Sequence, residues 1–200
     1  MNVPFEVRLC ALLLLLAAVA LWDYRRRGDA ATKWREYGFL VVAAILGGAI
    51  GVGADSLTSR LSPEYFVRFK GIEPGDGFYG RVLALGFHAG FLAGAVAGMC
   101  VLLANNPKPT YPPLTYGQLF RSLWRPVAAA IACAALYGVA LAPVVPTTAF
   151  DEFTSGLSLS AEAWLVRVWC VHFGLYFGAT AGVVWVVAHF RSQRRAAMTQ

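Results

Sequence analysis

Charged residues are scarce in this chain, and their scarcity excludes an ordinary soluble domain. Asp, Glu, Lys and Arg make up 14% of the 200 residues, whereas 58% are apolar. A soluble globular domain carries about 25% charged residues. Several stretches of roughly 20 apolar residues, each long enough to cross a hydrocarbon core, use most of the chain. We therefore predict a membrane protein with no separate soluble domain.

Cysteines are also few, and the common catalytic and metal-binding patterns are absent. The four cysteines lie far apart in apolar segments, without a Cys-x-x-Cys pair or a Cys/His cluster, so we interpret them as small apolar side chains. The sequence contains no Walker loop, zinc-protease motif or Gly-x-Ser-x-Gly. Asp151 and Glu152 are adjacent in an expected loop, which is poor geometry for a catalytic pair. The sequence thus predicts a protein that is not an enzyme and holds no metal.

Apolar stretches and basic residues together predict the membrane topology. The net charge of +6 comes from Lys and Arg without the basic-aromatic pattern of nucleic-acid binding, so no nucleic-acid partner is expected. The larger share of Lys and Arg falls inside if the N-terminus is outside and the C-terminus is cytoplasmic. We expect five spans, at residues 9–22, 39–54, 82–104, 127–145 and 164–190.

The first apolar block, residues 7–22, has two interpretations. Its charge-free part is short enough for the core of a signal peptide. However, Glu6 precedes it beside Arg8, and the basic run Arg25–Arg27 follows it instead of a small-residue cleavage site. We favour a short retained helix. One membrane domain then comprises this helix and a basic loop (1–36), a first hairpin (37–104) and a second hairpin (124–190).

Two apolar spans share a glycine pattern, which organises the expected fold. His88–Gly98 aligns without gaps onto His172–Gly182 as His-x-Gly-x-x-x-Gly-Ala-x-Ala-Gly. Chance agreement is a competitor because Gly is frequent in membrane helices, but we favour an internal duplication. The fold predicted is an all-α polytopic membrane bundle, with four core helices as two parallel-repeat hairpins plus a short N-terminal helix.

The glycines themselves are expected to serve helix packing. Small residues spaced by four let lipid-embedded helices approach closely, and we prefer this interpretation to a glycine-lined pore. Glycine faces left free would allow a homo-oligomer. The packing residues are Gly86, Gly90, Gly94, Gly98, Gly174, Gly178 and Gly182.

His88 and His172 occupy equivalent places in the two spans, and ionisable side chains at such depth are candidates for function. One interpretation is a histidine hydrogen-bonded between helices. The other is cofactor binding, because two imidazoles at similar depth can ligate a haem. Both histidines lie off the glycine face, since each is half a turn from the nearest glycines.

The polar segment after the second span begins with a helix-start signal. Ser62-Pro63-Glu64 offers a hydroxyl cap, a first-turn proline and an acid, which predicts a helix over 62–71 lying in the outer interface. Five charged residues at this outer mouth either pair with each other and with lipid headgroups, or bind a small solute or periplasmic partner. They are Asp55, Arg60, Glu64, Arg68 and Lys70.

The same segment resembles a family of uncharacterised bacterial inner-membrane proteins. The similar pattern is Asp-x-x-Thr-x-Arg-x-Ser-Pro-Glu-Tyr-Phe, present here from Asp55 to Phe66. The resemblance covers about residues 35–100, and the first apolar block looks like an addition to it. It implies a location in the bacterial inner membrane and a membrane architecture, but no activity.

These observations favour a structural or accessory membrane subunit, with the lipid bilayer and a homo-oligomer or membrane-complex partner around it. The alternative is a small-solute or ion transporter or channel, or a haem-binding redox protein that uses His88 and His172.

Overall fold

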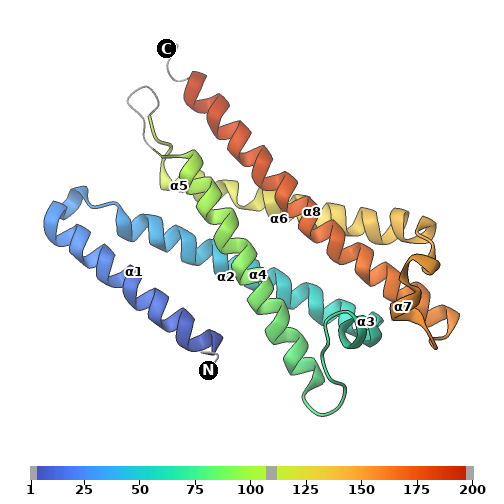
Figure 1. The fold of residues 1–200 in the computed structure, drawn as a ribbon. Helices are drawn as coiled ribbons and strands as arrows, with labels where there is room; N and C mark the ends of the chain where they lie inside the picture. The colour runs from blue at the N-terminus through green and yellow to red at the C-terminus, as the bar shows by residue number, and fades with distance from the viewer. Residues whose placement is uncertain (1–3, 107–111, 197–200) are drawn as a thin grey trace.

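The computed structural model describes residues 4–106 and 112–196, and in these ranges the chain is helical without strands (Figure 1). The prediction of an all-α fold is confirmed. Between the expected spans 82–104 and 127–145, residues 107–111, including Pro107 and Pro109, lie outside the described residues.

Five helical segments of the described chain are long and apolar enough to cross a bilayer, which supports a multi-pass membrane protein. They are α1 (Phe5–Arg27), α2 (Lys33–Leu61), α4 (Phe78–Ala104), α8 (Leu159–Ala196) and a composite segment. The composite consists of α5 (Tyr116–Ser122), α6 (Trp124–Leu136), the π-helical turn η2 (Tyr137–Leu141) and η3 (Ala142–Val144). Shorter elements connect them, namely η1 (Gly28–Ala30), α3 (Pro63–Arg68), η4 (Thr147–Phe150) and α7 (Asp151–Thr154).

Between the expected spans 82–104 and 127–145, the chain forms the additional helix α5. Thr115 and Gln118 make a capping box, in which the Gln118 backbone N–H donates to Thr115 Oγ1 (3.4 Å) and the Thr115 N–H to Gln118 Oε1 (2.8 Å). This arrangement satisfies two backbone donors that have no partner within the helix. The Thr-x-x-Gln spacing could have predicted the start of α5, but the prolines before it are typical of a loop.

Helices α2 and α4 form the first hairpin, and their contact is made by glycine. A Cβ built on Gly51 would overlap the carbonyl oxygen of Gly86, and one built on Gly90 would overlap that of Gly47. Backbone therefore touches backbone over several turns, which is the close approach that small residues permit between membrane helices.

Helices α6 and α8 form the second hairpin in a similar way, except that α6 offers alanine where α2 offers glycine. A Cβ on Gly174 would lie 2.6 Å from the Cys133 carbonyl oxygen, and a Cβ on Gly178 would lie 2.7 Å from Ala130 Cα. The glycine stripes of α4 and α8 thus each pack on the preceding long helix of the same hairpin.

The two hairpins lie beside each other, with α8 in contact with α4 and α2 (Figure 1). Apolar clusters join them at both ends. At one end, α2, α4, α5 and α8 contribute the cluster that we name the Phe39 cluster. It contains Phe39, Ala43, Val101, Leu119, Leu123, Val186 and Phe190. At the other end lies the Tyr65 cluster, formed by α3, α4 and α8 and containing Tyr65, Phe66, Phe78, Val82, Leu165 and Val168.

The prediction of an interfacial helix over 62–71 is wrong in its bounds and in the surroundings of α3. It spans only Pro63–Arg68, and its Tyr65 and Phe66 are buried in the Tyr65 cluster instead of facing lipid. The cap is as predicted, because Ser62 Oγ accepts from the Tyr65 N–H (3.4 Å). The amphipathic pattern was correct, but the apolar side covers the end of the bundle.

Helix α1 lies at the edge of the bundle against α2 (Figure 1). Its Asp23 caps α2, since Asp23 Oδ2 accepts from the backbone N–H groups of Thr32 (3.0 Å) and Lys33 (3.1 Å). An acid at the start of a helix also meets the positive end of its dipole. At its other end, the Phe5 ring lies 4.0 Å from the ring of His88 on α4.

The end of α8 is tied to the end of α4 by one buried arginine. Arg194 is 6% exposed, and its guanidinium donates to the carbonyl oxygens of Ala104 (2.7 Å), Asn106 (2.9 Å) and Pro112 (3.0 Å). The final carbonyls of a helix have no partner within it, so this side chain caps α4 from a distant part of the chain.

Replacing Arg194 by alanine should lower the free energy of unfolding by about 2–4 kcal/mol, because three hydrogen bonds donated by a charged group are lost. Arg194→Lys should restore only part of this loss, since an ammonium lacks the planar fork. Denaturation in detergent measures the effect, and Arg191→Ala is the matched control because Arg191 is exposed. Equal losses for Arg194→Ala and Arg191→Ala would contradict the capping role.

Candidate functional site

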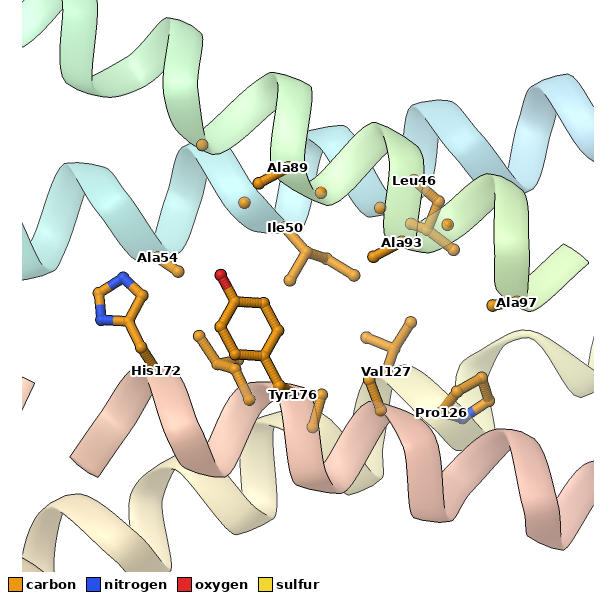
Figure 2. A pocket seen from close by; sticks show the side chains of 18 of the residues that line it. Leu46, Ile50, Ala54, Ala89, Ala93, Ala97, Pro126, Val127, His172 and Tyr176 are labelled. Atoms are coloured by element: carbon orange, nitrogen blue, oxygen red, sulfur yellow. The ribbon is translucent and has the colours of Figure 1, made fainter. Parts of the chain in front are cut away.

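A cavity of about 170 Å³ lies between the two hairpins, bounded by α2 and α4 on one side and by α6 and α8 on the other (Figure 2). Most of its wall is apolar and much of it is small, which follows from the glycine and alanine content of the four helices. Its apolar lining includes Leu46, Ile50, Ala54, Ala89, Ala93, Ala97, Pro126 and Val127.

Polar side chains gather at one end of this cavity, next to the Tyr65 cluster. Asp55, Lys70, His172 and Tyr176 are among the lining residues there. Figure 2 shows His172 and Tyr176 side by side on α8, one turn apart, with both side chains directed into the space facing α2 and α4. The opposite end, at Ala97 and Pro126, is apolar.

Asp55 and His172 form a buried pair that connects the two hairpins. Asp55 is 6% exposed and His172 is 5% exposed, and Asp55 Oδ1 lies 2.9 Å from His172 Nε2. The other ring nitrogen, Nδ1, lies 2.9 Å from the backbone carbonyl oxygen of Val168. Both imidazole nitrogens are therefore engaged.

These partners determine how many protons the pair holds. A carbonyl oxygen can only accept a hydrogen bond, so Nδ1 carries a proton and donates it to Val168. Nε2 and Asp55 Oδ1 must then share one proton, either as imidazolium and carboxylate or as neutral imidazole and carboxylic acid. In both forms the pair is neutral as a whole, which limits the cost of burying it. The geometry makes it a site that can store and release one proton.

The glycine stripe of α4 leaves room for the Asp55 carboxylate. A Cβ built on Gly86 would lie 2.7 Å from Asp55 Oδ2, which is shorter than real Cβ contacts. Gly86 therefore contributes to the site as well as to the hairpin contact. Any side chain at position 86 would push the carboxylate away from His172.

Helix α3 covers the pair with aromatic rings. The Tyr65 ring stacks on His172 at 4.8 Å between centroids, and Phe66 meets the same imidazole edge-on at 5.9 Å. Burial raises the pKa of the Tyr65 phenol, with smaller contributions from Tyr176 and Asp55, so this hydroxyl stays protonated at physiological pH. The Lys70 ammonium also lies over the Tyr65 ring, 5.6 Å from its centroid.

The five charged residues predicted at the outer mouth do not form one cluster. Asp55 belongs to the buried pair, and Lys70 reaches the cavity end. Arg68 donates to the backbone carbonyls of Phe153 (2.9 Å) and Ser155 (2.8 Å), which fastens α3 to the loop around α7. In residues 4–106 and 112–196, no ion pair joins two of the five.

Arg60 and Glu64, like Arg68, do not line the cavity. Arg60 is exposed near Tyr79 on the outer side of the first hairpin. Glu64 accepts a hydrogen bond from Ser62 Oγ at 3.2 Å and so supports the start of α3. Neither residue contributes to the candidate site.

His88 and His172 are equivalent in the sequence pattern but have different surroundings. His88 is half-buried and packs against Phe5 and Phe87, whereas His172 packs against Tyr65 and Asp55. Because both nitrogens of His172 are already hydrogen-bonded, none is free to ligate iron. The arrangement gives no support to a haem held between these two residues, and the interpretation of a histidine hydrogen-bonded between helices describes His172.

Sequence reasoning named Asp55 and His172 separately but missed that they pair, and it did not name Tyr176. One signal could have indicated the pairing. If the two hairpins run in the same direction, Asp55 and His172 lie toward the same end of their apolar spans. Nothing in the sequence pattern shows which side of α2 faces α8.

Comparison of the chain with protein-family models, with curated protein sequences and with solved structures gives no match. The site is therefore interpreted from its own geometry.

Proposed function

We propose that this chain is a proton-coupled transporter of a small solute, with the Asp55–His172 pair as its proton site. The observation that carries the proposal is the buried pair at the polar end of a cavity between two hairpins. Ionisable residues inside membrane segments are costly and commonly mark proton relays and substrate paths in transporters.

The arrangement of the hairpins supports the same proposal. Each hairpin is held by backbone contact along its glycine stripe, whereas the hairpins meet at the two apolar clusters and across the cavity. Two rigid units around a central site are what alternating access requires. The Asp55–His172 hydrogen bond crosses between the units, so a change in its protonation acts where they would move.

A purely structural or accessory subunit is the competing proposal. Such a subunit needs helix packing, which glycine alone supplies, but it needs no buried acid and histidine. Replacing a buried ion pair by apolar residues is often neutral or stabilising. The pair at Asp55 and His172 is therefore better explained by a functional requirement than by stability.

We further propose a bacterial inner-membrane location with the N-terminus outside and the C-terminus in the cytoplasm. The distribution of Lys and Arg supports this orientation, and the resemblance of the segment from Asp55 to Phe66 supports the location. In this orientation the Asp55–His172 end of the cavity is the outer end. The shared glycine pattern of α4 and α8 also supports an origin of the two hairpins by duplication.

Proton flux in proteoliposomes tests the proposed function. Vesicles that hold a pH-sensitive dye receive one solute at a time: a small apolar amine, a carboxylate, an alcohol or an inorganic cation. We expect at least one solute to drive a proton flux in the wild type that exceeds the flux in Asp55→Asn vesicles about tenfold or more, since the variant lacks a group that can share a proton with His172.

Asp55→Asn is a suitable blank because an asparagine amide can donate to Nε2 and keep the pair hydrogen-bonded. Vesicles of this variant also correct for amines that cross the lipid unaided. If no solute class gives a flux above the blank, the transporter proposal fails, and the accessory subunit becomes the better explanation.

A further inference from the structure

The size of the cavity suits a small molecule. An apolar cavity of ~150 Å³ accepts a benzene molecule, and the cavity between the hairpins has about 170 Å³. One aromatic ring or one short alkyl chain therefore fills most of it. The apolar wall from Ala89 to Ala97 on α4 and at Val127 on α6 suits such a body.

The polar end of the cavity presents acceptors that lack a donor. Asp55 is more than nine-tenths buried, yet among the described residues its Oδ2 atom receives no hydrogen bond, since His172 lies on Oδ1. The Tyr176 hydroxyl points across the cavity toward α2 and α4 (Figure 2) and is likewise without a hydrogen bond to the described chain. Oδ2 is not enclosed by the described chain, so a hydrogen-bond donor placed in the cavity can reach it and offset the cost of burying the carboxylate.

We infer that the cavity binds a small apolar amine in its ammonium form, with the nitrogen at Asp55 and the apolar body between the hairpins. This inference rests on the proposed function, because it names the class of solute that is transported. An ammonium fits better than an alcohol because it supplies several donors, and Asp55 Oδ2, the Tyr176 hydroxyl and His172 Nε2 are the acceptors at this end.

The proton balance of this exchange closes. When the ammonium binds, the proton shared by Asp55 and His172 is released to solvent. The His172 Nδ1 atom keeps its own proton and still donates it to the Val168 carbonyl oxygen. The site then holds a carboxylate, a neutral imidazole and one ammonium, so its total charge is the same as before. Amine binding and proton binding are therefore mutually exclusive at Asp55, which couples the two.

Few other titratable groups face the pair. Tyr65 and Lys70 come from α3 and the residues after it, and Tyr176 comes from α8, whereas the neighbouring position of α4 is Gly86. Lys70 is exposed at this end and its positive charge opposes a bound cation. Lys70→Gln should therefore strengthen amine binding, which is the opposite of what a site for an anion predicts.

Isothermal titration of the full chain in detergent with 2-phenylethylamine tests the inference. We expect saturable binding with release of one proton, measured from the dependence of the heat on the buffer. Ethylbenzene has a similar body without the charge, and phenylacetate has a similar body with the opposite charge. Both should bind about tenfold or more weakly, given the strength of hydrogen bonds to charged groups.

Variants locate the binding site. Asp55→Asn should weaken 2-phenylethylamine binding about tenfold or more, and Tyr176→Phe should weaken it less, because the phenol is one acceptor among three. Since Tyr176 is half-exposed, its variant keeps the test valid even if Asp55→Asn does not fold. No binding, binding unaffected by both variants, equal affinity for ethylbenzene or tighter binding of phenylacetate would each overturn the inference.

The binding and flux experiments test the two proposals independently. Binding of 2-phenylethylamine without solute-driven proton flux contradicts the transporter proposal and leaves the amine site in place. Proton flux driven by another solute class, with no amine binding, contradicts the amine site and leaves the transporter proposal in place.

Discussion

Replacing His172 by leucine is expected to lower the free energy of unfolding by about 3–5 kcal/mol. The substitution leaves the Asp55 carboxylate buried with no partner on either oxygen, and breaking a buried pair by removing one member costs this much. The stack of Tyr65 on the imidazole is lost as well. Unfolding by denaturing detergent in mixed micelles, followed by helix content, measures the change.

Asp55→Asn is the informative partner of this variant. The asparagine amide can donate to Nε2 while Nδ1 donates to Val168, so the hydrogen bond between the hairpins persists and a loss of only about 1 kcal/mol is expected. The double variant Asp55→Leu with His172→Leu should be more stable than His172→Leu alone, because no unpaired charge is left. If His172→Leu and Asp55→Asn destabilise equally, the pair is not the buried, hydrogen-bonded unit described above.

Gly51→Ala is expected to lower the free energy of unfolding by about 1–3 kcal/mol, the range for overpacking a close contact. The new Cβ would overlap the Gly86 carbonyl oxygen and lie 3.3 Å from Gly90 Cα. These are backbone atoms, so no side chain can rotate away and the hairpin must open. The displacement also moves Gly86, which borders Asp55, and it should therefore reduce amine binding.

Gly53→Ala is the matched control for this substitution. Gly53 lies two residues further on the same helix, and a Cβ there meets nothing within 4 Å. Because alanine favours a helix over glycine by about 1 kcal/mol, Gly53→Ala should be neutral or stabilising. Opposite signs for the two variants in one unfolding assay support the glycine contact, whereas the same sign would refute it.

The glycine contact between α2 and α4 is expected to affect both the stability of the protein and the proposed amine site. The glycines that let α2 and α4 touch also place Gly86 beside the Asp55 carboxylate. Close packing and the buried pair are therefore coupled, and substitutions on the stripe should affect both measurements.

The sequence by itself determined the helical membrane architecture of this protein. Apolar runs of bilayer length predict helices because a backbone in lipid must satisfy its hydrogen bonds within the segment. The glycines at every fourth position likewise predict close helix contacts, because that spacing places them on one face. Both are local properties, readable from neighbouring residues such as Gly86, Gly90 and Gly94.

Helix α3 illustrates the limit of this local information. Its cap at Ser62 follows from the sequence, since a cap uses atoms a few residues apart. Whether its aromatic side faces lipid or protein does not, because both surroundings accept Tyr65 and Phe66. Only the position of α8 decides that these rings cover His172.

The candidate site itself was decided by the tertiary structure. Asp55 and His172 are 117 residues apart, and their pairing depends on how one hairpin is rotated against the other. The sequence pattern alone does not determine such a pairing, since His88 shares the pattern of His172 but packs against Phe5. Helix periodicity determines which residues share a face, whereas the contact between two faces is set by packing along the whole interface.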